Sequence, residues 1–585
     1  MRFIGYGIGL LLVGVFALGT PATAAQKPFV TYDHPALEAI SEAYAADQIS
    51  KAEAMLYRFY FVMAPERLPA QFSIPGPPIK SGTPILTEVL TQLDQLTPLM
   101  RGEVAGMRLR PSLPNTRTSA HYVIHYDGAS TTEEYIDVIE GAAEAAWAKY
   151  HTDMTWNVPP GDGSIGGGTD LTDCYVHSLG SGILGMAQPE SFVPGGASND
   201  ATGYFHVNTT ISDEPLRCVT TAHEYMHVTQ FGYLYVSGIT WWMENCAMMG
   251  EEWTYDVYNE YLPYLPPFFT YPYWSLDTFG GSYEYAQITW PMYLSERFVL
   301  ETVEEIWEEQ MWSFSGNFWT AINTVLAPYG YGSNSAYLEF MRWCFYTGSR
   351  DDGNHLSEAG DFGMVYNVDK VVSEFPSGEK GPRPLKLPEP LGTSVIIIRP
   401  ETSSSDNILE ITFDGPASTL AVEFIREAAD GCTEYFMTID DNGDGYIEIP
   451  NFDTAIYVHM LTSMKRNAGS AQDFSFWAET SYDPQGLADL DSGRLVRIHP
   501  NRPNPFANRT AIEYALPNAA NVQIRILDPT GRVVRHLYEG HQYAGDYEVT
   551  WNRQDDAGRG VGSGVYYALL TVAGQELARK MTVLD

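Results

Sequence analysis

Hydrophobic positions recur with two different periods along the chain, and the change of period separates its parts. Residues 26–115 hold one clear helical stretch, "ALEAISEAYAADQISKAEAMLYRFYFVM", in which apolar residues return every three or four positions. From residue 116 the pattern is mixed: "SAHYVIHYD" alternates as a strand does, and "TTEEYIDVIEGAAEAAWAKYH" is amphipathic with the period of a helix. We expect a helical N-terminal region, either a propeptide or a docked subdomain, before an α+β domain that spans residues 116–385.

Strand-like alternation replaces the helical period after residue 385. Short runs such as "SVIIIRP", "ILEITFD" and "LAVEFIR" lie between turn residues, which predicts a β-sandwich over residues 388–482. A linker rich in proline and glycine, "PSGEKGPRPLKLPEP", precedes it. Residues 495–585 alternate again, as in "VQIRILD" and "GVYYALLTV", and predict a second all-β domain.

The first 25 residues have the pattern of an export signal. Arg2 is followed by the apolar run "FIGYGIGLLLVGVFALG" and by the small residues of "ATAA", which offer a cleavage site. An uncleaved membrane anchor is the alternative for residues 1–25. No later stretch is apolar for long enough to span a bilayer. We therefore expect a mature protein that is secreted or attached to the bacterial cell surface and has no transmembrane span.

Composition narrows the range of partners. The 585 residues include 73 acidic and 34 basic ones, for a formal net charge of −39. Such a surface repels nucleic acid and anionic membranes, so we expect no nucleic-acid partner. The five cysteines contain no Cys-x-x-Cys pair, which argues against a thiolate zinc site. Their odd number leaves one thiol unpaired after any disulfide pairing, which the sequence does not define.

The segment "VTTAHEYMHVTQFGYLY" contains the pattern His-Glu-x-x-His. His223 and His227 are four residues apart, so a helix turns both imidazoles to one face, where they can bind one ion. Glu224 lies beside the coordination position that the two rings leave open. In "ITWWMENCAMMGEEWTYDV", Glu244 shares a helix face with apolar residues and needs a cation or another partner. The pattern predicts a zinc site; a helix whose Glu244 reaches water or an arginine is the alternative.

Together the two segments resemble the gluzincin branch of the zinc metallopeptidases. The resemblance rests on His-Glu-x-x-His followed by Trp-Trp-x-Glu-x-x-Ala-x-x-x-Glu. The runs "HEYMHVTQFGY", "WWMEN", "YLSERF" and "IWEE" are similar to secreted bacterial metallopeptidase-like proteins of the MXAN_6640 type. The resemblance implies that His223, His227 and Glu244 bind Zn²⁺ and that Glu224 is the general base for zinc-activated water. It also implies that "TGYFHVNTT" is the edge strand that holds an extended peptide.

Further roles follow from the same resemblance. Tyr285 is expected to donate a hydrogen bond to the tetrahedral oxyanion, with Tyr283 as its rival. Met248 stands where some gluzincins carry a carboxylate behind a histidine ligand, and Glu251 is the candidate to replace it. The implied function is that of a secreted zinc metallopeptidase acting on a protein or peptide substrate. A non-catalytic surface adhesion or binding protein on the same scaffold and a zinc hydrolase of non-peptide substrates are the alternatives.

Two features of the C-terminal half bear on metal binding and export. The run "DDNGDGYIEI" has the first positions of a calcium loop but reaches Asn451 where that loop needs a bidentate glutamate, so a hairpin turn is favoured over structural Ca²⁺. Residues 495–585, with "PNPF" and "DPTGRVV", resemble FlgD Ig-like domains and the sorting domains of type IX secretion cargo. That resemblance implies the outer-membrane secretion machinery as a partner. The expected fold is an α+β zincin domain with a helical N-terminal region, followed by two all-β Ig-like sandwich domains.

Overall fold

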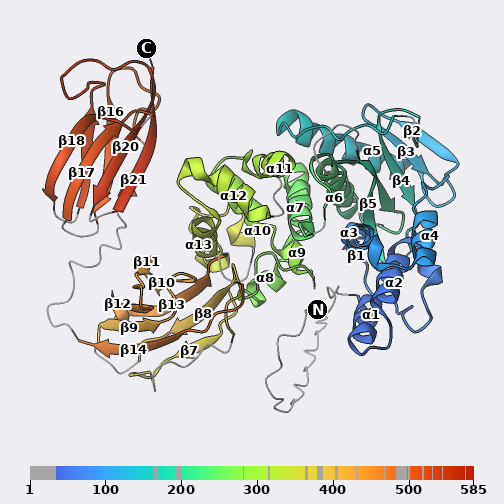
Figure 1. Ribbon diagram of the computed structural model, residues 1–585, viewed down its shortest axis with the longest axis horizontal. Helices are drawn as coiled ribbons and strands as arrows, with labels where there is room; N and C mark the ends of the chain where they lie inside the picture. Colours follow the sequence, from blue (N-terminus) through green and yellow to red (C-terminus); the bar gives the residue numbers. More distant parts are fainter. Residues whose placement is uncertain are drawn as a thin grey trace, which may run out of the picture. The chain divides into compact units, whose positions relative to one another are not determined.

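The computed structural model describes residues 34–584 apart from short gaps, and Figure 1 shows its helices and strands. The chain divides into two compact units. The gaps are 164, 167, 181, 193–199, 237, 281, 314–316, 363–365, 378–385, 402–405, 430, 467–468, 483–496, 499–500, 517–519, 530, 543–544 and 573–574. Unit 1 comprises Met1–Pro267 and Phe279–Ala321, and unit 2 comprises Phe268–Thr278 and Ile322–Asp585. The predicted export signal, residues 1–25, lies outside the described residues.

A six-stranded mixed sheet runs through unit 1 in the order β1-β5-β6-β4-β3-β2. Its strands are β1 (Ile79–Ser81), β2 (Asn115–Thr118), β3 (Tyr122–Tyr126), β4 (Thr172–His177), β5 (Ile183–Phe192) and β6 (Ala201–Asn208). Strands β3, β4 and β6 are parallel, β5 is antiparallel to β6, and β1 lies parallel to β5. Strands β3 and β4 bury almost every side chain, which explains why their sequences are apolar without strict alternation.

Unit 1 also contains α-helices. They are α1 (Pro35–Ala45), α2 (Lys51–Met63), α3 (Thr83–Thr91), α4 (Pro98–Met107), α5 (Glu133–Trp147), α6 (Glu214–Tyr233), α7 (Thr240–Tyr255), α9 (Tyr283–Ala286), α10 (Thr289–Arg297) and α11 (Thr302–Ser313). α5 begins after Thr132, whose hydroxyl accepts the N–H of Tyr135. α6 packs on β5 and β6 with one side and on α7 with another. The two segments that carry the predicted metal ligands are therefore neighbouring helices beside the sheet.

The N-terminal region shares its core with the sheet. Its helices α1 to α4 enclose apolar side chains such as Leu37 and Phe59, and Ile183 and Met186 of β5 are buried in the same cluster. Strand β1, also from this region, extends the sheet at β5. The boundary expected at residue 115 therefore does not separate two cores, because the apolar faces of these helices are buried against β5.

The segment "TGYFHVNTT" does not form an edge strand. It contains most of β6, which pairs with β4 on one side and with β5 on the other. Nearly all of its side chains are buried, as expected for an inner strand. The edge strand on this side of the sheet is β1, which pairs with β5, and β5 lies between β1 and β6.

Unit 2 contains a sandwich built from a five-stranded sheet, β11-β10-β13-β8-β7, and a three-stranded sheet, β12-β9-β14. The strands are β7 (Lys370–Val372), β8 (Thr393–Ile398), β9 (Ile408–Asp414), β10 (Leu420–Ala428), β11 (Gly431–Met437), β12 (Asp444–Pro450), β13 (Ala455–Met464) and β14 (Ser475–Ser481). Both sheets contribute to one core, which includes Leu409, Phe424 and Phe476.

The sandwich unit begins earlier in the chain than the sequence predicts. Helix α13 (Ser333–Trp343) and β7 lie before residue 388 but belong to unit 2. Arg342 of α13 pairs with Glu423 and Glu434 of the five-stranded sheet, at 2.5 and 3.2 Å. The predicted end of the α+β domain of residues 116–385 is therefore too late in the chain, because α13 packs with the sandwich. Helices α8 (Pro266–Thr270) and α12 (Phe318–Leu326) each span a boundary between the units.

The C-terminal residues form a second sandwich, as predicted. Its sheets have the orders β15-β16-β19 and β18-β17-β20-β21. The strands are β15 (Arg497–Ile498), β16 (Thr510–Leu516), β17 (Ala520–Leu527), β18 (Val533–Gln542), β19 (Gly545–Trp551), β20 (Gly564–Val572) and β21 (Gln575–Val583). The core includes the fully buried Ile524, Trp551 and Leu570. The linker residues 483–496 that precede this domain lie outside the described residues.

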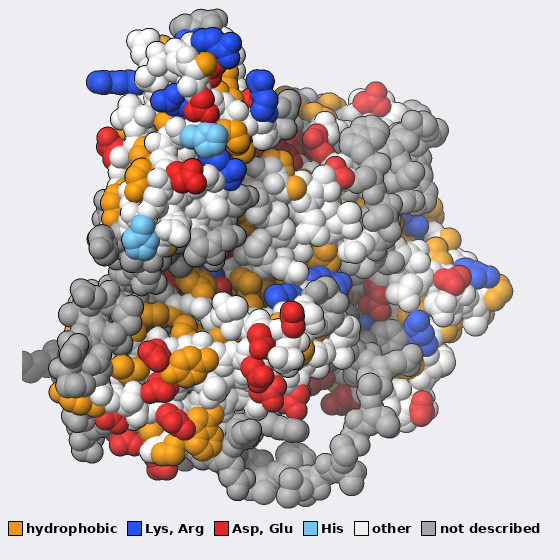
Figure 2. Space-filling view, turned by 60° about the vertical axis from the view of Figure 1, so that its left-hand side comes forward, with side chains coloured by type: hydrophobic (Ala, Val, Ile, Leu, Met, Phe, Trp, Pro, Cys, Tyr) orange, Lys and Arg blue, Asp and Glu red, His pale blue; other side chains and the backbone are white. Residues whose placement is uncertain are grey.

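The surface is rich in acidic side chains. They are spread across the face of the molecule shown in Figure 2, in keeping with the net charge of −39. On the three-stranded sheet, the hydroxyl of the exposed Tyr446 lies 3.0 Å from a carboxylate oxygen of Glu410 and 2.9 Å from one of Glu448. Such a surface favours cationic or neutral partners over anionic ones.

No disulfide joins any of the five cysteines, all of which the structure describes, and four of them are buried. The odd count predicted at least one free thiol, and the structure joins none of the others. Among the described residues, no helix combines the length and the hydrophobicity that crossing a membrane requires.

Candidate metal centre

Helix α6 carries the His-Glu-x-x-His segment into the interior of unit 1. The helix begins after Asp213, whose carboxylate accepts the N–H of Leu216. His223, Glu224 and His227 are fully buried. The ring centroids of the two histidines are 4.8 Å apart, as expected for residues one helical turn from each other.

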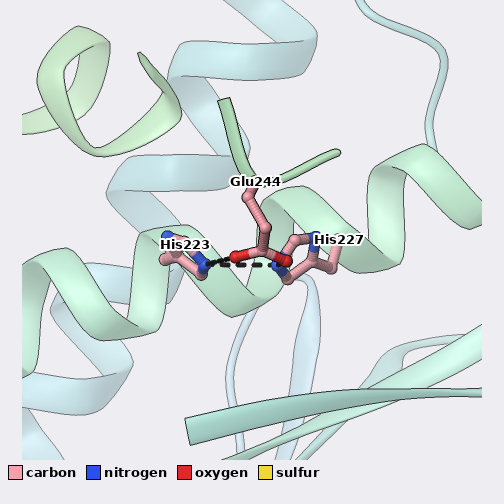
Figure 3. A group of neighbouring side chains, drawn as sticks. All are labelled: His223, His227 and Glu244. Carbon is pink, nitrogen blue, oxygen red and sulfur yellow. Dashed lines mark hydrogen bonds and ion pairs between the residues drawn. The ribbon is translucent and has the colours of Figure 1, made fainter. Parts of the chain in front are cut away.

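Glu244 of α7 reaches the two imidazoles from the neighbouring helix (Figure 3). Its Oε2 lies 3.2 Å from Nε2 of His223, and its Oε1 lies 3.1 Å from Nε2 of His227. The two Nε2 atoms are 3.2 Å apart. The structure thus brings together the three side chains that the sequence singles out as ligands.

The outer nitrogen of each ring has a partner that fixes its protonation. Nδ1 of His223 lies 2.6 Å from Oε1 of Glu251, and Nδ1 of His227 lies 2.9 Å from Oε1 of Gln230. The amide nitrogen of Gln230 donates to the carbonyl of Met243, which leaves its oxygen to accept from the ring. In their neutral form, both rings therefore carry the proton on Nδ1 and present a lone pair on Nε2.

This set of atoms fits a small divalent cation. Two Nε2 lone pairs and a carboxylate that face one another at 3.1 to 3.2 Å repel unless positive charge lies among them. Ligand atoms arranged tetrahedrally around Zn²⁺ at about 2.0–2.1 Å are about 3.3 Å from one another. Two imidazoles and one carboxylate are also a ligand set that catalytic zinc uses.

The ionisation of the cluster shows the same demand for positive charge. Burial alone lowers the pKa of His223, but its hydrogen bonds to Glu244 and Glu251 raise that pKa to about 9. Burial alone raises the pKa of Glu244, but the charge on His227 and the contact with His223 lower it to about 2. A proton on an imidazole and a metal ion therefore compete for the same place.

Glu224 lies beside the cluster with its carboxylate only partly engaged. Its Oε2 accepts a hydrogen bond of 3.0 Å from the hydroxyl of Thr83. Its Oε1 is buried and has no hydrogen-bond partner among the described residues. Burial raises the pKa of Glu224, which suits a group that must take up a proton. Gly185 of β5 leaves room for this side chain, since a Cβ there would lie 2.7 Å from Cγ of Glu224.

A lysine from the N-terminal region completes the network behind His223. Lys80 of β1 is buried, and its Nζ lies 2.8 Å from Oε2 of Glu251. Glu251 thus holds the His223 ring with one oxygen and Lys80 with the other. Glu251, the candidate for the carboxylate that is missing at Met248, does lie behind His223. The buried ammonium group of Lys80 balances its charge.

The remaining sequence candidates are also placed. The ring of Tyr285 in α9 lies 6.3 Å from that of His223, centroid to centroid, and Tyr283 is buried in the same short helix. Cys246 is not among the grouped ligand atoms, and its sulfur accepts the indole N–H of Trp307 at 3.4 Å. The structure therefore gives no reason to regard Cys246 as a ligand.

Four residues of this centre are missed by reading the sequence: Lys80, Thr83, Gly185 and Gln230. Gln230 could have been found, since it stands three residues after His227 and so lies on the same face of the helix. Lys80, Thr83 and Gly185 are far away in the chain, and no local pattern marks them. Their roles depend on which strands lie next to β5.

The calcium-like run forms a turn. Oδ1 of Asp440 accepts backbone N–H groups from Asn442 at 2.8 Å and from Asp444 at 3.0 Å. These bonds are those of a turn closed by an aspartate side chain. The turn precedes β12 and fits the hairpin that the sequence favours; structural Ca²⁺ stays a prediction.

Comparison with known families identifies the C-terminal domain. The family described as FlgD Ig-like domain matches residues 506–576. The match lies within the second sandwich and confirms the predicted Ig-like fold for that part of the chain. No curated protein matches the chain.

Solved structures give only partial matches. PorZ, a surface component of the type IX secretion system of Porphyromonas gingivalis, is 21% identical over 19% of this chain, with a TM-score of 0.12. Latent PorU from the same organism is 17% identical over 38% of this chain, with a TM-score of 0.16. The chain spans 14% and 19% of the lengths of these two proteins. TM-scores this low carry no argument about fold or function.

Proposed function

We propose that the chain is a zinc metallopeptidase of the gluzincin type. The observation that carries the proposal is the meeting of two bare Nε2 atoms and one carboxylate at 3.1 to 3.2 Å, with a second carboxylate beside them. The described residues offer three ligands here. A closed structural zinc site uses four protein ligands, whereas a catalytic site uses three and keeps one position for water or substrate.

Each residue of the centre has a role in this proposal. His223, His227 and Glu244 would hold the ion, which would polarise the scissile carbonyl and lower the pKa of water. Glu224 takes the proton from the attacking water and delivers it to the leaving amine.

Around this core, Glu251 and Gln230 keep both rings in the tautomer that presents Nε2. Tyr285 donates a hydrogen bond to the oxyanion. The tyrosine is proposed from its place beside His223.

Export belongs to the same proposal. The N-terminal apolar run has the pattern of a signal, and the Ig-like domain matched at residues 506–576 resembles the sorting domains of secreted cargo. We propose that this domain takes the protein to the cell surface, through the outer-membrane machinery that the sequence suggests. A protein that keeps the centre only to bind a surface ligand, and a hydrolase of non-peptide bonds, are the competing functions.

The deciding experiment measures bound zinc and peptide hydrolysis on the same samples. Wild type, Glu224→Gln and the exposed control Glu134→Gln are loaded with zinc, and the metal is measured per chain. We expect one zinc in all three, and casein hydrolysis that Glu224→Gln lowers by about 10²–10⁴. Zinc without hydrolysis of casein or of a mixed peptide pool in wild type would favour the binding protein, and absence of zinc would end the proposal.

A further inference from the structure

The metal centre is closed to solvent in this structure. His223, Glu224, His227 and Glu244 all have 0% exposure. A peptidase centre must admit a polypeptide to the general base, so some element has to move before a substrate can bind. The residues in contact with Glu224 show which element that is.

The element over the centre is a short segment of the N-terminal region, residues 77–83, which we name the strap. It contains β1 and the first residue of α3. The N–H of Ile79 donates to the carbonyl of Gly182, and that of Gly82 donates to the carbonyl of Gly185, both at 2.9 Å. These bonds occupy the outer side of β5, where an extended polypeptide would otherwise pair as an added strand.

Side chains of the strap occupy the polar groups of the centre as well. The hydroxyl of Thr83 donates to Oε2 of Glu224 and accepts the backbone N–H of Ala187 at 2.7 Å. Lys80 binds Glu251, which holds His223. The strap therefore contacts three parts of the centre at the same time: the proposed general base, the edge of β5, and the carboxylate that holds the ring of His223.

β1 is a three-residue strand at the edge of the sheet, so displacement of the strap would break its bonds to β5 and leave the pairing among the other five strands in place. Pro77 and Pro78 are exposed and have no N–H, so pairing with β5 cannot extend beyond β1 in that direction. A cavity of about 180 Å³ lies beside it, lined by Pro77, Pro78, Ile79 and Lys80 of the strap and by Tyr264, Ser282 and Tyr285. Withdrawal of the strap would remove one wall of this cavity, next to the tyrosine proposed for the oxyanion.

We propose that residues 77–83 are an autoinhibitory strap: they occupy the β5 edge that receives an extended polypeptide substrate, and they hold the centre closed until they are displaced. This inference rests on the proposed peptidase function, and it specifies how that function is restrained. It gives the N-terminal region a regulatory role at the centre in addition to its share of the core.

A reversible cross-link tests the strap. Ile79 and Ile183 are register partners on β1 and β5, and adjacent strands bring Cα atoms within the range that a disulfide spans. The double variant Ile79→Cys/Ile183→Cys locks the strap when oxidised and frees it when reduced. The matched control, Thr118→Cys/Val123→Cys, joins β2 to β3 at the other edge of the sheet.

Two rates are measured on zinc-loaded protein, oxidised and reduced: extraction of zinc by the chelator dipicolinate, and hydrolysis of casein. We expect oxidation of the strap pair to slow zinc extraction at least tenfold and to abolish hydrolysis, and oxidation of the control pair to change neither. Equal extraction rates for the oxidised and reduced strap pair would overturn the strap.

Two further outcomes separate this inference from the proposed function. Zinc that is bound and exchanges at a lock-dependent rate, with no hydrolysis by the reduced pair or by Thr83→Ala, in which the strap loses its bond to Glu224, would support the strap and contradict the peptidase. A folded chain that binds no zinc would overturn both. Should the cysteine pair not fold, Thr83→Ala provides the second test: we expect faster zinc extraction by several-fold, and an unchanged rate would count against the strap.

Discussion

The metal centre of unit 1 and the core of the C-terminal domain bury their side chains for opposite reasons. At the centre, two helices and β1 bury histidines, carboxylates and a lysine that all need partners. In the C-terminal core, apolar residues such as Ile524, Trp551 and Leu570 are buried together. Burial of a charge costs free energy unless it is paired, whereas burial of apolar surface lowers the free energy of folding.

The apolar residues of the C-terminal core therefore stabilise the fold, whereas the charged residues of the centre cost free energy of folding unless they are paired. Replacement of a core residue in the C-terminal domain should lower stability and leave metal binding unchanged. If the centre binds zinc as proposed, replacement there should change metal binding most, because the ion would offset the repulsion between the side chains that hold it.

The largest effect should come from removal of the third ligand. For Glu244→Ala we expect zinc affinity to fall by roughly a thousandfold or more, because the proposed site would lose one of its three protein ligands. Affinity is measured by competition with a chromophoric chelator. The exposed Glu134→Ala in α5 is the control, and zinc affinity equal to wild type in Glu244→Ala would show that this carboxylate is not a ligand.

The next effect concerns stability in the other region. Trp551 is fully buried in the C-terminal core against the rings of Phe506 and Tyr566. For Trp551→Ala we expect the unfolding free energy of that domain to fall by about 3–5 kcal/mol, with zinc content unchanged. Calorimetry of the full chain measures the first and metal analysis the second; Leu584→Ala, at an exposed side chain, is the control. Loss of zinc in Trp551→Ala would break the separation between the two regions.

A smaller effect should follow from the support of His223. Glu251→Gln keeps the shape of the side chain but removes the charge that holds the His223 ring and pairs with Lys80. We expect zinc affinity to fall about 10–100-fold, as it does when the outer partner of a histidine ligand is changed. The double variant Lys80→Met/Glu251→Gln, which leaves no buried lysine without a partner, should recover part of the lost stability. Unchanged zinc affinity in Glu251→Gln would mean that the ring needs no charged partner.

The smallest effect is one of pH and concerns the first sandwich, whose ion pairs lie nearer to solvent. The hydrogen bond from His459, together with Arg350, lowers the pKa of Glu427 from 4.5 to about 2. A carboxyl with a lowered pKa in the folded state stabilises that state above its unfolded pKa, and this contribution is lost as pH falls from about 4.5 towards 2. We expect Glu427→Gln to flatten the acid limb of the unfolding curve in this window. If the acid limb of Glu427→Gln were identical to that of wild type, the contacts of Glu427 with His459 and Arg350 would contribute nothing to the free energy of unfolding.

The spacing of residues along the chain was sufficient to predict individual helices, strands and the faces on which their side chains lie. The spacing of His223 and His227 defines one helix face, and the separate helix of Glu244 follows from its own apolar period, so the ligand set was open to prediction. Alternation in the last ninety residues likewise predicted a sandwich that the FlgD Ig-like match confirms.

Long-range pairing was not accessible in the same way. The edge-strand role of "TGYFHVNTT" came from the resemblance, and hydrophobic period could not correct it, because an inner strand and an edge strand that are both apolar have the same period. In the structure β6 is an inner strand, and β5 separates it from the edge strand β1. The same limit hid Lys80 and Thr83, whose contacts with Glu251 and Glu224 span 171 and 141 residues of sequence. The boundary at residue 385 was predicted from a change of composition. Helix α13 lies before that residue, yet it packs with the sandwich that comes after it.

The lack of a disulfide among the five cysteines has a consequence for how the protein folds. Since no disulfide links residues within either unit, formation of the native state needs neither an oxidant nor a disulfide isomerase. Folding is then indifferent to the redox poise of the compartment in which it takes place. The same polypeptide should reach its final shape in a reducing cell interior and keep it after leaving that environment.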